Sequence, residues 1–205
     1  MDSPSSPWRG AEPLLLASTS PTRRALLAAA GLAVETRSPG VDERAVEAAC
    51  LGLAPADLAR RLALAKAEAV AACAPDRIVV GADQVLECDG AVFHKPADAD
   101  AARAQLGRLA GRTHRLHSAV ALIGASETET FVETAHLTLR PLAPEAIAAY
   151  VALAGPGATA SVGAYQLEGL GIHLFSEIVG DHTTILGLPL LPLLARLRAR
   201  DLLAF

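Results

Sequence analysis

One short apolar segment constrains the fold of this chain more than any other feature. Residues 77–82 read Arg-Ile-Val-Val-Gly-Ala and are almost continuously apolar. A strand of this composition is typical of an α/β sheet, in which helices cover both faces and no side of the strand meets water. We therefore expect this segment to be an inner strand of a sheet enclosed by helices.

The rest of the chain alternates between helix and strand patterns. Further strands are predicted at residues 14–17, 34–37, 84–87, 91–94, 113–123, 128–139 and 172–175. Helices are predicted at residues 22–30, 55–73, 98–109, 144–153 and 189–204. Asp89-Gly90 indicates a tight hairpin, and the turn at 124–127 makes the two longest strands antiparallel neighbours. This mixture of parallel-type units and an antiparallel ribbon predicts an α/β or α+β chain with a mixed sheet.

Composition and the chain's first residues bear on its class and compartment. With 52% hydrophobic residues and a net charge of -4, the chain has enough apolar surface to fold rather than stay disordered. A pI of about 5.8 without a basic run argues against a nucleic-acid partner. Residues 1–13 are polar and Pro-rich, so we expect a flexible segment there and one domain over residues 14–205. No signal peptide or spanning segment is indicated, and three unpaired cysteines fit a soluble, cytoplasmic protein without a membrane partner.

Two lysines are exceptional in this sequence. Of 18 basic residues 16 are Arg, and only Lys66 and Lys95 are Lys. A coding bias explains the abundance of Arg. Under such a bias a retained Lys marks a position where a compact ammonium serves better than a planar guanidinium. Either lysine is also consistent with an ordinary surface charge.

The first predicted helix begins with a group of anion-binding residue types. Ser18 and Ser20 precede it, and Arg23 and Arg24 lie in its opening turn, where the helix dipole disfavours cations. Hydroxyls, free backbone N–H groups and guanidinium groups can converge on one small anion at such a place. Two solvated arginines after an ordinary helix cap explain the same residues equally well.

Two carboxylates are candidates for metal binding or for activating water. Asp83 directly follows the apolar strand at 77–82, and ligands of open α/β sheets gather outside the carboxyl ends of strands. Glu43 lies in an acidic loop. A turn-initiating Asp and a solvated Glu are the alternatives. Other motifs are excluded, since His114 and His117 face opposite sides of a strand and no dinucleotide, P-loop or Ser-hydrolase signature is present.

Eight segments in order resemble one known family. They are LLLASTSPTRRALLAAAGL from 14, VDE at 41–43, LALAKAEAV at 62–70, VVGADQVL at 79–86, HKP at 94–96, LGRLAGRTH at 106–114, GAYQLEGLGIHLF at 163–175 and GDHTTILGLPLLPLL at 180–194. The chain resembles the Maf family of nucleoside triphosphate pyrophosphatases over about residues 14–200. The resemblance implies an α/β, Maf/ITPase-like fold, elongated and two-lobed, with a mixed, partly antiparallel sheet and a central cleft. It also implies hydrolysis of a nucleoside triphosphate to the monophosphate and pyrophosphate.

Carried over by position, the resemblance assigns roles to the candidate residues. The phosphate-binding S-x-S-x-x-R motif corresponds to Ser18, Ser20, Arg23 and Arg24. Glu43 corresponds to a metal-side Glu, Asp83 to the general base and second metal-side carboxylate, and Lys66 and Lys95 to two phosphate lysines. The implied cofactor is a divalent cation, Mg²⁺ or Mn²⁺, and the resemblance is compatible with a homodimer. Both exceptional lysines therefore fall on motif positions.

Base choice in the family is set at three positions, which are Thr22, Gln84 and Glu168 here. The residues at these three positions are closer to those of the branch that prefers 7-methyl-GTP. The Glu168 carboxylate can accept hydrogen bonds from guanine N1–H and its 2-amino group. Thr22 stands where that branch often has Trp, and His94 stands where the family usually has Gly. The predicted function is hydrolysis of a modified nucleotide resembling 7-methyl-GTP to the monophosphate and pyrophosphate. The alternatives are a dTTP/UTP pyrophosphatase and a non-catalytic nucleotide-binding regulator of cell division.

Overall fold

The computed structural model describes residues 6–124 and 127–205. In these residues the strands are β1 (Leu14–Ala17), β2 (Val34–Thr36), β3 (Val79–Cys88), β4 (Ala91–Phe93), β5 (Thr113–Ile123), β6 (Thr128–Leu139) and β7 (Phe175–Val179). The α-helices are α1 (Pro21–Ala29), α2 (Glu43–Ala49), α3 (Pro55–Ala71), α4 (Ala99–Leu109), α5 (Pro144–Ala154), α6 (Gly157–Ala160), α7 (His182–Ile185) and α8 (Leu190–Ala199). Two 3₁₀ helices are η1 (Val162–Ala164) and η2 (Leu170–Leu174).

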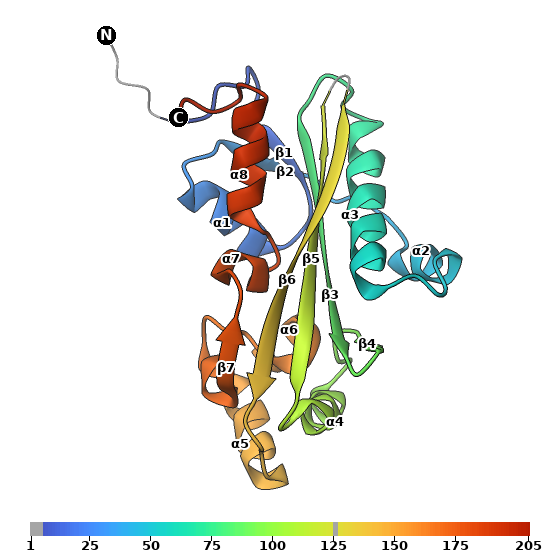
Figure 1. The fold of residues 1–205 in the computed structure, drawn as a ribbon, viewed down its shortest axis with the longest axis vertical. Coiled ribbons are helices and arrows are strands. Elements are labelled where there is room, and N and C mark those ends of the chain that lie inside the picture. The colour runs from blue at the N-terminus through green and yellow to red at the C-terminus, as the bar shows by residue number, and fades with distance from the viewer. Residues whose placement is uncertain (1–5, 125–126) are drawn as a thin grey trace. The chain divides into compact units, whose positions relative to one another are not determined.

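The strands form one mixed sheet, which confirms the predicted class (Figure 1). Its order is β2-β1-β3-β5-β6-β7, with β4 paired to β3. The pairs β1/β2 and β1/β3 are parallel, whereas β3/β4 and β6/β7 are antiparallel. The two-residue turn between β3 and β4 has positive φ at Asp89 and Gly90, as an Asp-Gly hairpin requires.

The predicted ribbon of β5 and β6 is confirmed with the expected bounds. The strands are neighbours in the sheet, and a connection as short as 124–127 can join only antiparallel strands. In agreement, the hydroxyl oxygens of Thr113 and Thr138, at opposite ends of the two segments, lie 2.9 Å apart. Residues 125 and 126 of the predicted turn lie outside the described residues.

Four expectations about local structure are wrong. β3 does not end before Asp83 but continues to Cys88, because Val85 and Leu86 are also buried and extend the apolar strand. The acidic segment after 41 is not a loop, since Asp42 caps α2 by accepting a hydrogen bond from the backbone N–H of Ala45 at 3.1 Å. The strand predicted at 172–175 is mainly η2, and β7 follows it. The last helix is also shorter than the predicted 189–204.

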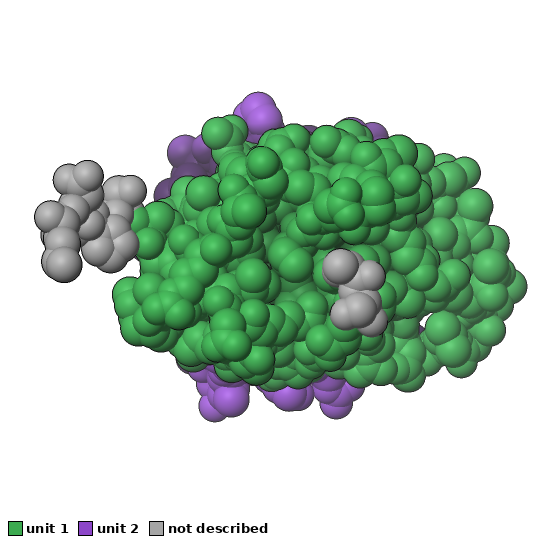
Figure 2. All heavy atoms as spheres, turned by 90° about the horizontal axis from the view of Figure 1, so that it is seen from above, with its two compact units in different colours: residues 1–84, 118–133, 182–205 green, residues 85–117, 134–181 purple. Residues whose placement is uncertain are grey.

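Contacts divide the chain into two compact units, coloured separately in Figure 2. The first unit contains residues 1–84, 118–133 and 182–205, and the second contains residues 85–117 and 134–181. The earlier expectation of a flexible segment at 1–13 and a single domain over 14–205 stays a prediction. Among the described residues of the first segment, Trp8 forms a β-bridge with Leu203.

The first unit is built in three layers around β1 and β3. Alternate side chains of these strands, among them Leu14, Leu16 and Val80, pack with Leu27 of α1 and Leu193 of α8. The helix α3 covers the opposite face (Figure 1). Gly81 permits this approach, because a Cβ there would lie 2.2 Å from the carbonyl oxygen of Ala63.

The second unit has an aromatic centre. His114, which is fully buried, lies with its Nε2 2.6 Å from the Oη of Tyr165, and the two rings contact Phe175. Burial lowers the pKa of His114 to about 4, so this imidazole is neutral near pH 7. Across the described residues, no helix has the length and apolar character needed to cross a membrane.

Candidate active site

The turn between β1 and α1 has the structure that its sequence predicts. Ser20 is the N-cap of α1, and its hydroxyl accepts a hydrogen bond from the backbone N–H of Arg23 at 3.4 Å. Pro21 takes the first helical position, where its missing N–H has no cost. The buried hydroxyl of Ser18 accepts from the backbone N–H of Ser20 at 3.1 Å. The turn therefore holds two hydroxyls at the positive end of α1.

The two neighbouring arginines point to different places. Arg23 turns inward, where its Nε donates to the carbonyl oxygen of Gly187 and its Nη1 to that of Ala82, each at 2.8 Å. Nη1 also lies 3.5 Å from the Oγ of Ser18. Burial lowers the pKa of Arg23, while the carboxylates of Asp83 and Glu43 oppose that shift. The structure thus brings Arg23 close to Ser18 and within the field of both predicted metal-side carboxylates.

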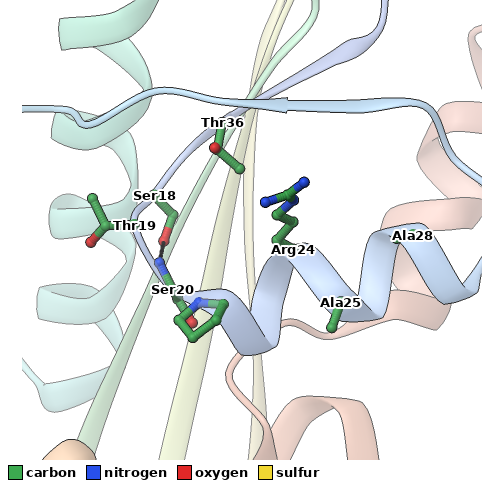
Figure 3. Close-up of a pocket in the computed structure, with 8 residues that line it drawn as sticks. Ser18, Thr19, Ser20, Arg24, Ala25, Ala28 and Thr36 are labelled. Atoms are coloured by element: carbon green, nitrogen blue, oxygen red, sulfur yellow. Dashed lines mark hydrogen bonds between the residues drawn. The ribbon is translucent and has the colours of Figure 1, made fainter.

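Arg24 is exposed and borders a pocket of about 330 Å³ on the outer side of α1. Figure 3 shows its side chain rising from α1 on the side of Thr36, away from the bond between Ser18 and Ser20. The pocket is lined by Ser18, Thr19, Ser20, Pro21, Arg24, Ala25, Ala28 and Thr36. Its volume is at the lower end of the range of small-molecule sites, and its lining offers hydroxyls and one guanidinium group.

Lys66 joins the two predicted metal-side carboxylates. Its Nζ lies 2.5 Å from Oδ1 of Asp83 and 2.7 Å from Oε1 of Glu43. The Lys66 and Asp83 side chains are 9% and 8% exposed, whereas that of Glu43 is 54% exposed. A buried cation with two carboxylate partners is electrostatically satisfied. The exposed Glu43 leaves one side of this trio open to a ligand.

The strand and helix periods explain how the trio forms. Side chains alternate along β3, so Asp83 points to the same face as Gly81, toward α3. Lys66 follows Ala63 by three residues and therefore lies on the helix face that packs against Gly81. The prediction that Asp83 lies beyond the strand end is wrong, because the carboxylate is inside β3 and its charge is matched by Lys66.

Gln84 points to the opposite face of β3. Its Nε2 donates to Oγ of Ser118 at 2.9 Å and lies 3.1 Å and 3.0 Å from the carbonyl oxygens of Thr184 and Ile185. Those carbonyls belong to the last turn of α7, and that of Thr184 also accepts a hydrogen bond from the backbone N–H of Gly187 at 3.0 Å. Thr22, the other predicted base-choice residue of this unit, is half-buried in α1.

Sequence reasoning missed Ser118, Thr184 and Gly187. Ser118 is fully buried within β5, and no motif in the adjoining sequence indicates a functional residue. Gly187 has φ +88°, a conformation that favours glycine, and its carbonyl accepts from Arg23. The Gly187-Leu188-Pro189 sequence is a turn signal that does indicate such a conformation.

Three predicted positions lie in the second unit. Lys95 and His94 follow β4 and are exposed, and the carbonyl oxygen of His94 accepts from Nε2 of Gln105 at 2.8 Å. Glu168 is exposed and lies between η1 and η2. Lys95 and Glu168 thus have side chains that water, and hence a ligand, can reach.

The family of the chain follows from comparison with known proteins. The model of the family described as Maf-like protein matches residues 13–200. This chain belongs to the Maf-like protein family. The match covers the β1–α1 turn, the Lys66 trio and Gln84, as well as Lys95 and Glu168 of the second unit.

Two similar proteins of the Maf-like family are named for their activities. The nucleoside triphosphate pyrophosphatase of Nitrobacter winogradskyi is 54% identical over 199 residues, which cover 96% of this chain and 98% of that protein. The 7-methyl-GTP pyrophosphatase of Rhizobium meliloti is 50% identical over 188 residues, 90% of this chain and 94% of that protein. Among solved structures, the Staphylococcus aureus Ham1 protein aligns over 63% of this chain and 73% of its own with a TM-score of 0.42 and 16% identity.

Proposed function

We propose that this Maf-like protein is a nucleoside triphosphate pyrophosphatase that hydrolyses a modified nucleotide resembling 7-methyl-GTP. The products are the nucleoside monophosphate and pyrophosphate, and the protein acts in the cytoplasm. One observation carries the proposal: Lys66 Nζ contacts Asp83 and Glu43 within 2.7 Å in a chain whose relatives are named for this activity. A hydrolase acting on acid anhydrides needs such a charged group beside its polyanionic substrate.

The carboxylates suit a divalent cation held together with substrate. Glu43 and Asp83 place oxygens around one Nζ atom, and within residues 6–124 and 127–205 no group of three His, Cys, Asp or Glu side chains could hold a metal. Mg²⁺ commonly takes one or two carboxylates and completes its shell with water and phosphate oxygens. Glu43 and Asp83 would hold Mg²⁺ or Mn²⁺, which when bound neutralises charge on the phosphates.

Other roles in the reaction, activation of water and binding of the phosphates, are assigned to residues of the first unit. Asp83 has one oxygen on Lys66, and its other oxygen accepts the proton of the attacking water. That water forms a P–O bond at the α-phosphorus as the α–β bridging bond breaks and pyrophosphate leaves. The hydroxyls of Ser18 and Ser20, at the positive end of α1, bind phosphate oxygens, with Arg23 beside them. Arg24 supplies a second, solvent-accessible guanidinium.

The remaining assignments concern phosphate and base binding. Lys95 is assigned to the triphosphate, and Thr22, Gln84 and Glu168 to the base. The carboxylate of Glu168 accepts from N1–H and the 2-amino group of guanine and favours a cationic methylated base. The Rhizobium meliloti relative, which is named a 7-methyl-GTP pyrophosphatase, supports this choice. Thr22 lacks an aromatic ring, so any contact with the cationic base lacks about 0.5–2 kcal/mol of cation–π energy.

A substrate panel tests the activity. 7-Methyl-GTP, GTP, ATP, CTP, UTP and dTTP are incubated with Mg²⁺ or Mn²⁺, with EDTA as control, and monophosphate and pyrophosphate are measured. We expect 7-methyl-GTP to have the highest kcat/KM. A preference for dTTP and UTP would support the pyrimidine alternative, and binding without turnover of any nucleotide would support the regulator.

Two variants test the residue roles. Asp83→Asn should abolish turnover and leave nucleotide binding measurable, whereas the matched Asp76→Asn, in an exposed turn, should behave as wild type. Near-normal activity of Asp83→Asn would remove this residue from the base role. Glu168→Gln should weaken guanine-type substrates relative to pyrimidine ones, and an unchanged ranking would contradict its assignment.

A further inference from the structure

The side-chain amide of Gln84 has only one orientation that its surroundings accept. Nε2 faces the carbonyl oxygens of Thr184 and Ile185 at 3.1 Å and 3.0 Å. Carbonyl oxygens only accept hydrogen bonds, so the amide atom that faces them is the nitrogen. Rotating the amide by half a turn would place Oε1 against both carbonyls and leave all of these contacts without a proton.

Ser118 makes a third contact in which the Gln84 amide nitrogen is again the donor. Its hydroxyl carries one hydrogen, which it donates to the carbonyl oxygen of Thr184 at 2.7 Å. The Oγ atom therefore meets Gln84, at 2.9 Å, with a lone pair. Because Ser118 is fully buried, no water competes for this bond. The hydrogen bonds run in one direction, from Gln84 to Ser118 and from Ser118 to α7.

The locked amide lies beside the phosphate-binding group of the first unit. A Cβ built on Gly187 would be 3.7 Å from Cδ of Gln84 and 3.4 Å from Nε of Arg23. Arg23 in turn reaches Ser18. Gln84 is half-buried, so part of its side chain is accessible to a ligand bound near Arg23. With Nε2 directed inward, the atom left for that ligand is Oε1.

We propose that Ser118 is a positioning residue for Gln84, and that together with the carbonyls of Thr184 and Ile185 it makes position 84 a hydrogen-bond acceptor toward substrate. This arrangement selects a triphosphate whose base carries an amino group. The selection depends on the proposed function, the hydrolysis of a nucleoside triphosphate. A base with a carbonyl at the same place meets Oε1 with a second acceptor and is disfavoured. Guanine and hypoxanthine differ only by the 2-amino group, so GTP and ITP are the matched probes.

The ratio of kcat/KM for GTP over ITP measures the selection. Loss of one hydrogen bond to an uncharged acceptor corresponds to about a tenfold change, and we expect wild type to prefer GTP by at least that factor. Gln84→Met, which keeps the length and removes the acceptor, should lower the ratio several-fold, because the 2-amino group then keeps only its assigned contact with Glu168. Ser118→Ala should lower the ratio through a higher KM for GTP. Ser176→Ala is the control, because its exposed hydroxyl also donates to a strand carbonyl, that of Thr138.

A purely structural role of Ser118 would lower turnover of both nucleotides equally. An unchanged GTP/ITP ratio in Ser118→Ala would therefore overturn the positioning role, and an unchanged ratio in Gln84→Met would overturn the selection. Thermal unfolding of each variant establishes that it is folded at the assay temperature.

Hydrogen exchange of the free protein tests the fixed orientation of the Gln84 amide without any turnover. In ¹H–¹⁵N spectra the side-chain NH₂ signals of Gln84 are identified by their loss in Gln84→Met. We expect them to exchange at least tenfold more slowly than those of the exposed Gln166, and Ser118→Ala should accelerate them. Exchange as fast as that of Gln166 would overturn the positioning role. If no triphosphate is hydrolysed, the proposed function and the substrate selection fail, and the exchange rates alone decide the role of Ser118.

Discussion

Replacing Gly81 with alanine tests how the packing of α3 on β3 builds the Lys66 trio. A Cβ at this position would lie 2.2 Å from the carbonyl oxygen of Ala63 and 2.8 Å from the backbone nitrogen of Ala67. Both atoms belong to the helix backbone and cannot swing aside. The helix must therefore retreat by about 1 Å before ordinary contact distances return.

This retreat has two measurable consequences. Overpacking of this kind lowers the free energy of unfolding by about 1–3 kcal/mol. Lys66 moves with α3, so its 2.5 Å contact with Asp83 lengthens by about the same 1 Å and ceases to be a hydrogen bond. We therefore expect Gly81→Ala to lose both stability and triphosphate turnover.

Urea unfolding followed by circular dichroism measures the first effect, and release of pyrophosphate measures the second. Gly107→Ala is the matched control, since this residue lies within α4 and a Cβ there would have no neighbour within 4 Å. Alanine in that helix should raise the free energy of unfolding by up to about 1 kcal/mol. A Gly81→Ala protein as stable and active as wild type would refute the close approach of α3 as the origin of the trio.

Three further predictions concern basic side chains. Lys66→Arg and Lys95→Arg each keep the positive charge, yet each should lower kcat/KM at least tenfold because a planar guanidinium replaces a compact ammonium; full activity of either would show that charge alone suffices. Arg23→Lys removes the donors that reach the carbonyls of Ala82 and Gly187, and should lower the melting temperature by several degrees, measured by calorimetry. The pKa of His114 is lowered from 6.5 to about 4, so the unfolded chain binds the proton more tightly than the folded one. Stability should therefore fall as pH drops from 6.5 to 4, by about 3 kcal/mol in total, and His114→Gln should flatten this part of the urea-midpoint profile.

Local sequence signals predicted several elements residue for residue. The bounds of β1, β5 and β6 agree with the predicted ranges, because an apolar run or an alternating pattern between turn residues leaves little freedom in where a strand begins and ends. The helix cap at Ser20 was also predictable, since a hydroxyl followed by proline satisfies backbone N–H groups within three residues. By contrast α2 has no buried residue, and without an apolar face it gave no helical pattern to detect.

The candidate site was likewise predictable from the sequence only in part. Residue types alone identified Asp83, Glu43 and Lys66 as charged groups in suggestive places, and the two rare lysines were visible in the composition. The sequence did not predict that Asp83 lies inside a strand. A buried carboxylate is tolerable there only because Lys66, on a helix that packs over Gly81, lies 2.5 Å away.

The sequence by itself determined the mixed α/β class, most strand and helix positions and the chemical types of the site residues. These depend on hydrophobic periodicity and on hydrogen bonds between residues close along the chain. Only the tertiary structure decided that Arg23 turns inward to Gly187 and that Gln84 directs its nitrogen to Ser118 and α7. The partners of these side chains are 34 to 164 residues away, and such distant groups meet only when whole helices and strands have packed.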